Sequence, residues 1–350
     1  MQCDLLQRQA DILEQRANNP SAALDQVLKA CRIDPLNMAL LDRAERLATQ
    51  LDAHLERAWI AERRVQAAAD DESRARQLMR HAEIADLGLK DREQAMRSLT
   101  RALTLSERSP QVAAEIEDVA RSLDRARPEL GRGDAMRSLV RAHIDLAQHL
   151  GEPFGPLLVL RASQLLRSDL EDESACFDVL KQGATLFPDD LDLYDALERS
   201  AVLIKRLDAL DAHLSRAIQR SNDAELRLGL LQRRGKLLGE HLKRYGKAAE
   251  VYRELLALDP DDQAARDALP TMLRRDGRYQ DLLRLYDEWL QRSDDPTQRI
   301  QLMREKAKLW EMELRNRSGA IEVWRKVLEL SPDDSEASAM LSRLHELRHQ

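Results

Sequence analysis

Five copies of one helix-pair pattern, spread from Leu6 to Leu330, constrain the fold of this chain more than any other feature. Each copy places a small residue in a first helix, a second small residue thirteen positions later, and an apolar residue four positions beyond that. The first small residues are Ala10, Ala82, Ser163, Gly235 and Ala307. The later pairs are Ala23 and Val27, Ala95 and Leu99, Cys176 and Leu180, Ala248 and Tyr252, and Ala320 and Trp324. Successive copies are 72, 81, 72 and 72 residues apart, and this periodicity indicates a repeat protein whose stacked units bury a continuous core.

Apolar residues inside each copy recur three or four positions apart, which predicts α-helices. In the fifth copy, for example, Ile300, Met303 and Ala307 fall on one side of a helix. The second helices close at Asp34-Pro35, Ser109-Pro110, Phe187-Pro188, Asp259-Pro260 and Ser331-Pro332. The residue before a proline is pushed out of the helical region, so a helix ends there.

Two further helices separate successive copies, so each period contains four helices. We predict an all-α fold of about nineteen helices, in which short loops make neighbouring helices antiparallel. The expected organisation is a single array over residues 1–350. Its copies cover approximately 1–70, 71–153, 154–222, 223–294 and 295–350.

One copy is longer than the others by nine residues. We place about three of these before Pro110 and the rest in the loop 125–134. A loop insertion is tolerated on the surface, and this one is interpreted either as a binding loop or as a neutral insertion. The array begins inside a first helix and ends after the helix 335–349. We therefore expect either that the array continues in a longer parent protein or that its two ends pack on a partner.

Composition narrows the classes of function. The net charge is −7 and the isoelectric point is about 5.7, which disfavours nucleic-acid binding because that requires a basic excess. No run of 18 apolar residues and no signal peptide occurs, so we expect no membrane insertion and a cytoplasmic location. Cys3, Cys31 and Cys176 form no C-x-x-C pair and are expected to be reduced thiols, two of them in the core. No nucleotide-binding motif or Cys/His cluster is present, so we expect no cofactor and no metal.

Residues 248–262 (AAEVYRELLALDPDD) and 320–334 (AIEVWRKVLELSPDD) resemble the second helix and closing turn of a tetratricopeptide repeat. The family pattern there is A-x-x-x-F-x-x-A-L-x-L-x-P, whereas the family's first-helix pattern W-x-x-L-G-x-x-Y is absent. The resemblance implies a right-handed superhelical α-solenoid. It also implies that first helices line a concave groove that holds segments of partner proteins, and it implies no catalysis.

In that family the fifth position of the first helix points into the groove. Here the corresponding positions hold Arg8, Arg80, Arg161, Arg233 and Glu305. A row of guanidinium groups would bind the carboxylates of an acidic peptide. The alternative is that each arginine pairs with a Glu on the next helix. A single exposed pair contributes only about 0–1 kcal/mol, so several arginines would have to act together.

Chaperone-binding members of the family place an Asn where this chain has Ile12, Ile84, Leu165, Leu237 and Leu309. A chaperone adaptor is therefore disfavoured, and this apolar row is interpreted as core or as the floor of the groove.

A zinc-peptidase pattern, H-E-x-x-H, occurs at His345, Glu346 and His349. Two His residues four apart share a helix face and could bind zinc, but a catalytic site needs a third ligand and none follows. We interpret the match as chance and keep a zinc hydrolase as a distant alternative. The leading prediction is a non-enzymatic scaffold that binds another protein, and the main alternative is a structural or regulatory spacer in a larger multidomain protein.

Overall fold

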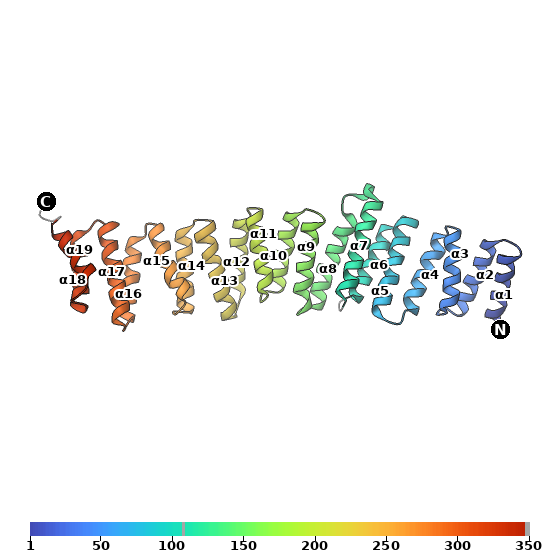
Figure 1. Ribbon diagram of the computed structural model, residues 1–350, viewed down its shortest axis with the longest axis horizontal. Coiled ribbons are helices and arrows are strands. Elements are labelled where there is room, and N and C mark those ends of the chain that lie inside the picture. The colour runs from blue at the N-terminus through green and yellow to red at the C-terminus, as the bar shows by residue number, and fades with distance from the viewer. Residues whose placement is uncertain (107–108, 347–350) are drawn as a thin grey trace. The chain divides into compact units, whose positions relative to one another are not determined.

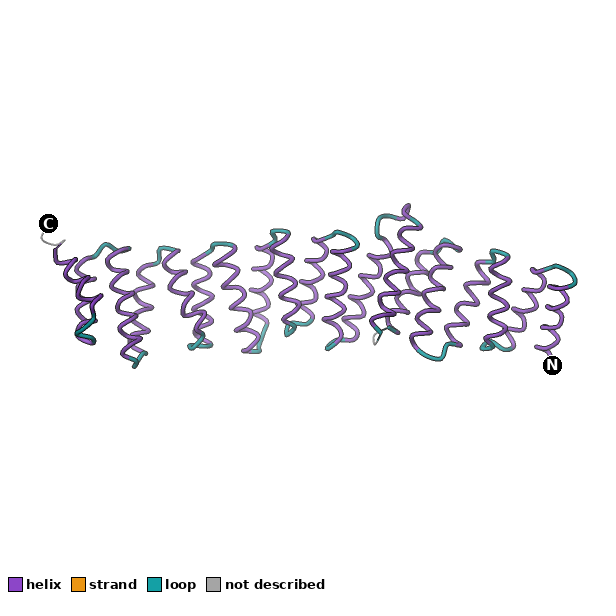
Figure 2. The backbone as a smooth tube through the Cα atoms, in the orientation of Figure 1, coloured by secondary structure: helices purple, strands orange, loops and turns teal. Residues whose placement is uncertain are grey.

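The computed structural model describes residues 1–106 and 109–346, and every regular element in these ranges is helical (Figures 1 and 2). Nineteen α-helices follow one another in the described chain, which confirms the all-α prediction and the expected number of helices. The chain divides into two compact units, Met1–Ile204 and Lys205–Gln350.

The first unit contains eleven α-helices and two short helices of other types. They are α1 (Gln2–Gln15), α2 (Pro20–Ile33), α3 (Met38–Gln50), α4 (His54–Ala67), α5 (Asp71–Glu83), the π-helix η1 (Ile84–Gly88), α6 (Arg92–Leu105), α7 (Pro110–Ala126), the 3-10 helix η2 (Pro128–Leu130), α8 (Asp134–Leu150), α9 (Phe154–Ser168), α10 (Glu173–Leu186) and α11 (Leu191–Leu203). Consecutive α-helices of this unit pack against each other, as Figure 1 shows from α1 to α11.

The second unit contains eight α-helices and one π-helix in its described residues. They are α12 (Leu207–Arg220), α13 (Ala224–Lys236), the π-helix η3 (Leu237–His241), α14 (Tyr245–Leu258), α15 (Gln263–Arg275), α16 (Tyr279–Arg292), α17 (Pro296–Met312), α18 (Arg317–Leu330) and α19 (Ser335–Glu346). Here too each α-helix packs on the next one along the chain.

The turn inside each hairpin repeats more regularly than the sequence does. A residue with positive φ follows the first helix of every copy, namely Asn18, Lys90, Glu171, Lys243 and Arg315. The hairpins between copies have the same feature at Asp52, Gly133, Lys205 and Gly277. The first set is spaced by 72, 81, 72 and 72 residues and the second by 81, 72 and 72, so both follow the period of the copies. A left-handed residue ends a helix sharply, and its recurrence identifies the hairpin as the structural repeat.

The small residue of each first helix makes room for the large residue of the second helix. An ideal Cβ atom at Gly235 would lie only 2.8 Å from the ring of Tyr252. In the fifth copy Ala307 and Trp324 are both fully buried in one core cluster. The pattern that identified the copies is therefore the packing contact between the two helices of a hairpin.

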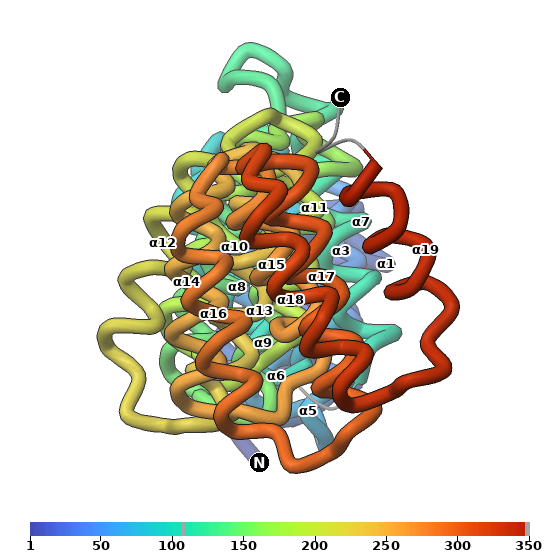
Figure 3. The backbone as a smooth tube through the Cα atoms, turned by 90° about the vertical axis from the view of Figure 1, so that its left-hand side faces the viewer, coloured from blue at the N-terminus to red at the C-terminus, as the bar shows by residue number. Residues whose placement is uncertain are grey.

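The nine extra residues of the longer copy all follow Pro110, and the placement of three of them before it is wrong. The C-cap of α6 (Ser106) and the N-cap of α7 (Ser109) each lie 72 residues after their counterparts Asp34 and Asn37. The extra length is taken up by α7, which has 17 residues where α3 has 13, by η2 and by the turn after it. This part of the first unit projects beyond the neighbouring hairpin loops (Figures 1 and 3).

Candidate protein-interaction site

The predicted arginine row lies on first helices, but two of its members are engaged in ion pairs. Arg80 of α5 binds Glu45 of α3, with 2.5 Å between Nη2 and Oε1. Arg161 of α9 forms a bidentate pair with Glu117 of α7 at 2.7 and 2.6 Å. Both glutamates are buried, so each guanidinium balances a carboxylate that has little contact with water. Each partner lies on the preceding odd-numbered helix rather than on the next helix.

The other three positions of the row differ from one another. Glu305 of α17 pairs with Arg274 of α15 at 3.4 Å, which is the same helix relationship with the charges exchanged. Arg233 is half-buried on α13. Arg8 is exposed on α1 and forms no ion pair within the residues that the structure describes. Arg80 and Arg161 therefore each pair with a glutamate, while their side chains stay 48% and 44% exposed.

Similar ion pairs join other successive odd-numbered helices. Arg43 of α3 pairs with Glu14 of α1 at 3.0 Å, and Arg76 of α5 pairs with Glu115 of α7 at 3.0 Å. The Arg43–Glu14 pair is partly buried, whereas the more exposed Arg76–Glu115 pair contributes at most about 1 kcal/mol. We call these contacts the odd-helix ladder.

Glu305 borders a cavity. A cavity of about 450 Å³ in the second unit is bordered by α15, α16, α17 and the end of α14. We call it the α15–α17 groove. Its lining includes Leu256, Pro260, Gln263, Arg266, Asp267, Pro270, Arg274, Tyr286, Trp289, Arg292, Gln298, Gln301, Leu302 and Glu305.

Aromatic rings form an apolar part of this groove. Tyr286 and Trp289 of α16 lie edge to face, with ring centroids 6.3 Å apart and an interplanar angle of 64°. Tyr286 is buried and its pKa is raised chiefly by that burial, so its hydroxyl stays protonated. Trp289 is half-buried, which leaves part of its ring available for contact.

Three arginines border the groove against two carboxylates. Arg266 and Arg274 lie eight residues apart on α15, with Pro270 between them, so all three share one helix face. Pro270 has no N–H to donate to the carbonyl of Arg266, and this leaves a backbone acceptor in the wall of the groove. Arg292 is exposed at the end of α16. The positive groups exceed the negative ones, although the whole chain is acidic.

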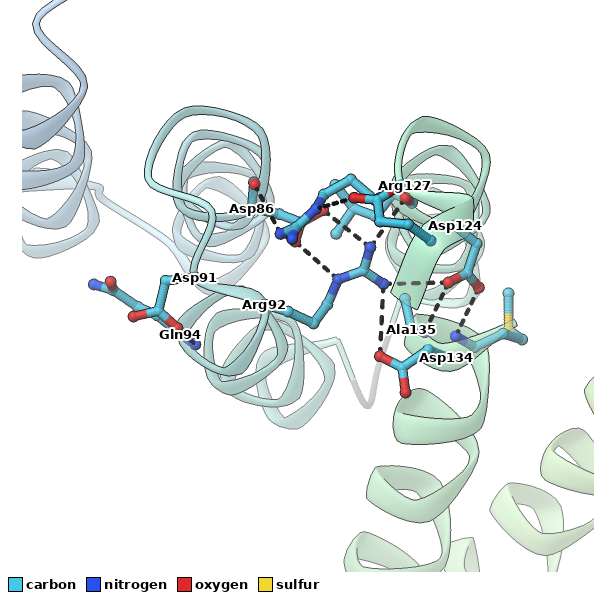
Figure 4. Close-up of polar contacts among 11 residues, drawn as sticks. Asp86, Asp91, Arg92, Gln94, Asp124, Arg127, Asp134 and Ala135 are labelled. Carbon is cyan, nitrogen blue, oxygen red and sulfur yellow. Dashed lines mark hydrogen bonds and ion pairs between the residues drawn. The ribbon is translucent and has the colours of Figure 1, made fainter. Parts of the chain in front are cut away.

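A second concentration of charge holds the longer copy in place (Figure 4). Asp86 of η1 is fully buried, and it accepts from Arg92 at 2.8 and 3.1 Å and from Arg127 at 3.0 Å. Arg92 also donates to Asp124 at 3.2 Å, and Asp124 accepts the backbone N–H of Ala135 at the start of α8. Because these contacts join η1, α6, α7 and α8, we interpret the cluster as an anchor for the inserted residues. Sequence reasoning missed it, since Asp86 and Arg92 lie about 40 residues from Arg127.

The zinc-peptidase pattern falls at the edge of the described chain. His345 and Glu346 are the end of α19, and His349 lies outside the described residues. Within the described residues no three His, Cys, Asp or Glu side chains come together in a way that could hold a metal ion. Cys31 and Cys176 are buried and Cys3 is half-buried, all as free thiols, which confirms the expected core positions. None of the described helices has both the length and the apolar character needed to cross a membrane.

Comparison with known proteins agrees with the hairpin geometry. Residues 228–262 match the family model of the tetratricopeptide repeat. A TPR repeat-containing protein of Pseudomonas aeruginosa is 29% identical over 141 residues, and the match covers 40% of this chain and 23% of that protein. The aligned region therefore spans less than a quarter of the relative's length.

Two of the solved structures that this chain matches are each 15% identical to it. The TPR domain of P58(IPK) superposes with a TM-score of 0.25, covering 100% of this chain and 99% of that one. Yeast Tom70 superposes with a TM-score of 0.26, covering 99% of this chain and 88% of that one. At TM-scores of this size the likeness carries no argument about function.

The stacked hairpins define the class: this is an all-α helical repeat protein. Within that class, the matched segment contains one of the two second helices in which the sequence resemblance was found, residues 248–262. The tetratricopeptide repeat is thus matched by this segment of the chain.

Proposed function

We propose that this protein is a non-enzymatic scaffold that binds an extended acidic segment of another protein in the α15–α17 groove. The observation that carries the proposal is the combination, in one cavity, of an exposed part of Trp289 with three arginines. Aromatic side chains and arginine are the residue types that contribute most to binding at protein interfaces. An acidic segment complements the excess of positive charge in the groove.

The arginines are expected to have different roles. Arg292 is exposed and can turn its guanidinium toward a carboxylate of the ligand. Arg266 donates its Nε to the carbonyl of Pro260 at 2.8 Å and pairs with Asp261 at 3.6 Å, so a ligand carboxylate would share it with Asp261. Arg274 is shared with Glu305, so a ligand carboxylate would compete for it.

The apolar contact is expected to come from Trp289 and Leu302. An apolar side chain placed between α16 and α17 would cover the exposed part of the indole, while the carboxylates of the segment lie toward α15. The best ligand therefore alternates acidic residues with at least one large apolar residue.

A peptide selection followed by titration tests this proposal. Peptides selected from a random library on the immobilised protein should be enriched in Asp and Glu around an apolar residue. In fluorescence anisotropy titrations, Trp289→Ala and Arg274→Glu should each weaken the selected peptides at least tenfold, and affinity should fall as salt is raised. Arg284→Glu is the matched control, because Arg284 is exposed on α16 and does not line the groove. Selected peptides without acidic residues, or equal weakening by all three variants, would contradict the proposal.

The odd-helix ladder favours a second candidate, a spacer that positions other domains. Ion pairs that link successive odd-numbered helices would together resist bending of such a spacer. Replacing the native gene by the Trp289→Ala variant separates the two roles. A spacer would keep its cellular function without the groove, whereas a scaffold of the proposed kind would lose it.

A further inference from the structure

The start of α9, well inside the first unit, exposes apolar side chains. Phe154 is 45% exposed and Leu157 is 62% exposed, and their spacing of three residues places them on one face of the helix. An ideal Cβ atom at Gly155 would lie only 2.3 Å from the ring of Phe187, so the end of α10 packs closely on this helix start. The turn after Phe187 leads to Leu191, which is 55% exposed at the start of α11 (Figure 1). We call Phe154, Leu157 and Leu191 the α9–α11 patch.

The repeat itself does not require an apolar residue at the position of Leu157. The equivalent positions of the other copies hold Asp4, Arg76, Gly229 and Gln301. Helices with these residues form the same hairpins, so the exposed leucine is a feature of the third copy and not of the fold. Described helices precede α9 and follow α11, so the patch does not arise from an end of the array.

Exposed carboxylates border the α9–α11 patch. Glu152 lies just before α9, Asp189 lies just before α11, and Asp192 is in the first turn of α11. In the part of the chain that the structure describes, none of the three forms an ion pair. The residue equivalent to Asp189 in the fourth copy, Asp261, pairs with Arg266 at 3.6 Å. The third copy therefore leaves its carboxylates available to cations from outside the unit.

We propose that the α9–α11 patch is a docking surface for an amphipathic helix with basic flanks, carried by a partner protein. Apolar side chains three or four residues apart on that helix cover Phe154, Leu157 and Leu191. Its Lys and Arg side chains pair with the carboxylates that border the patch. The α15–α17 groove was assigned a ligand of the opposite charge, so this inference goes beyond the function proposed above and stands or falls independently of it.

Titration with two matched peptides tests the proposal. The probes are labelled amphipathic helical peptides of about 18 residues, one made of Leu and Lys and the other of Leu and Glu in the same order. They are added to the full chain carrying Trp289→Ala, so that the α15–α17 groove does not contribute, and binding is followed by fluorescence anisotropy. The Lys peptide should bind saturably and at least tenfold more tightly than the Glu peptide. Leu157→Gln introduces the residue type of the fifth copy and should weaken the Lys peptide at least tenfold. Leu55→Gln is the control, because Leu55 is 71% exposed at the start of α4, and it should leave binding unchanged.

Charge reversal at the border of the patch gives a second readout. Asp192→Lys should weaken binding of the Lys peptide and strengthen binding of the Glu peptide. Equal affinity for the two peptides, or equal effects of Leu157→Gln and Leu55→Gln, would overturn the proposal. So would a dimer of the chain, measured by sedimentation, that Leu157→Gln dissociates, because a second copy would then be the occupant.

Discussion

The contact between Gly235 and Tyr252 allows the repeat pattern itself to be tested by mutation. Gly235 lies in the buried face of α13, and a Cβ atom there would lie 2.8 Å from Cε1 and Cζ of the Tyr252 ring. Real Cβ atoms do not approach so closely, so either the ring or the helix must shift. Overpacking of this kind lowers the free energy of unfolding by about 1–3 kcal/mol. Replacing a helical glycine by alanine, taken alone, raises it by about 0.5–1 kcal/mol. Gly235→Ala is therefore expected to lower the free energy of unfolding by up to about 2.5 kcal/mol.

The sign should reverse when the ring is removed. In the second copy an alanine at the equivalent position, Ala82, is fully buried, and the residue at the Tyr252 position is Leu99. In a Tyr252→Leu background, Gly235→Ala should thus raise the free energy of unfolding by up to about 1 kcal/mol. The assay is urea unfolding of the four proteins of this cycle, followed by circular dichroism and fitted together. An effect of Gly235→Ala that differs by less than about 0.5 kcal/mol between the two backgrounds would refute the reasoning.

Three other perturbations test particular parts of the structure. Asp86→Ala leaves Arg92 and Arg127 without their buried partner and should lower the free energy of unfolding, measured in urea, by about 3–5 kcal/mol. The control is Asp118→Ala, which removes an exposed partner of Arg121 and should lower it by less than about 1 kcal/mol. Lys243→Gly removes a side chain from a residue with φ of 53° and should stabilise the protein by about 0.5–1 kcal/mol in the same assay, while Gly at Lys247, inside α14, should destabilise it. Burial lowers the pKa of His143 below its ordinary value of 6.5. As the pH falls below 6.5, the unfolded chain therefore takes up a proton at His143 before the folded protein does. The contribution of His143 to the free energy of unfolding should therefore be fully present above about pH 6.5. Below that pH the free energy of unfolding should fall by up to about 1.4 kcal/mol per pH unit. His143→Gln should reduce this slope in thermal unfolding measured from about pH 7 to about pH 5.

Helix number and hairpin pairing could be predicted because apolar periodicity and the small-to-large contacts are local. The left-handed turns could not be predicted, since Lys90, Glu171 and Lys243 are not residue types that favour this conformation. The nine-residue insertion was misplaced because Pro110 was aligned with Pro35. Pro110 is the first residue of α7, whereas Pro35 lies in the turn before α3, and both positions suit proline for different reasons.

The residues of the predicted row lie on first helices, and the carboxylates that Arg80 and Arg161 bind lie 35 and 44 residues away in the sequence. Burial of Glu45 and Glu117 could not be inferred from a sequence rich in charged residues. The α15–α17 groove was missed for a similar reason, because Arg266 and Trp289 belong to a hairpin that matches the repeat pattern poorly. The spacing of Arg266, Pro270 and Arg274 along one helix face was the signal that could have found it.

The central claim, that this protein binds a partner segment in the α15–α17 groove, is tested most directly by hydrogen exchange. A partner captured from the native cell would be added to the purified chain, and amide exchange compared with and without it. The account predicts slower exchange in α15, α16 and α17, and loss of that protection in the Trp289→Ala variant. Protection confined to other helices, or protection that Trp289→Ala leaves intact, would contradict it.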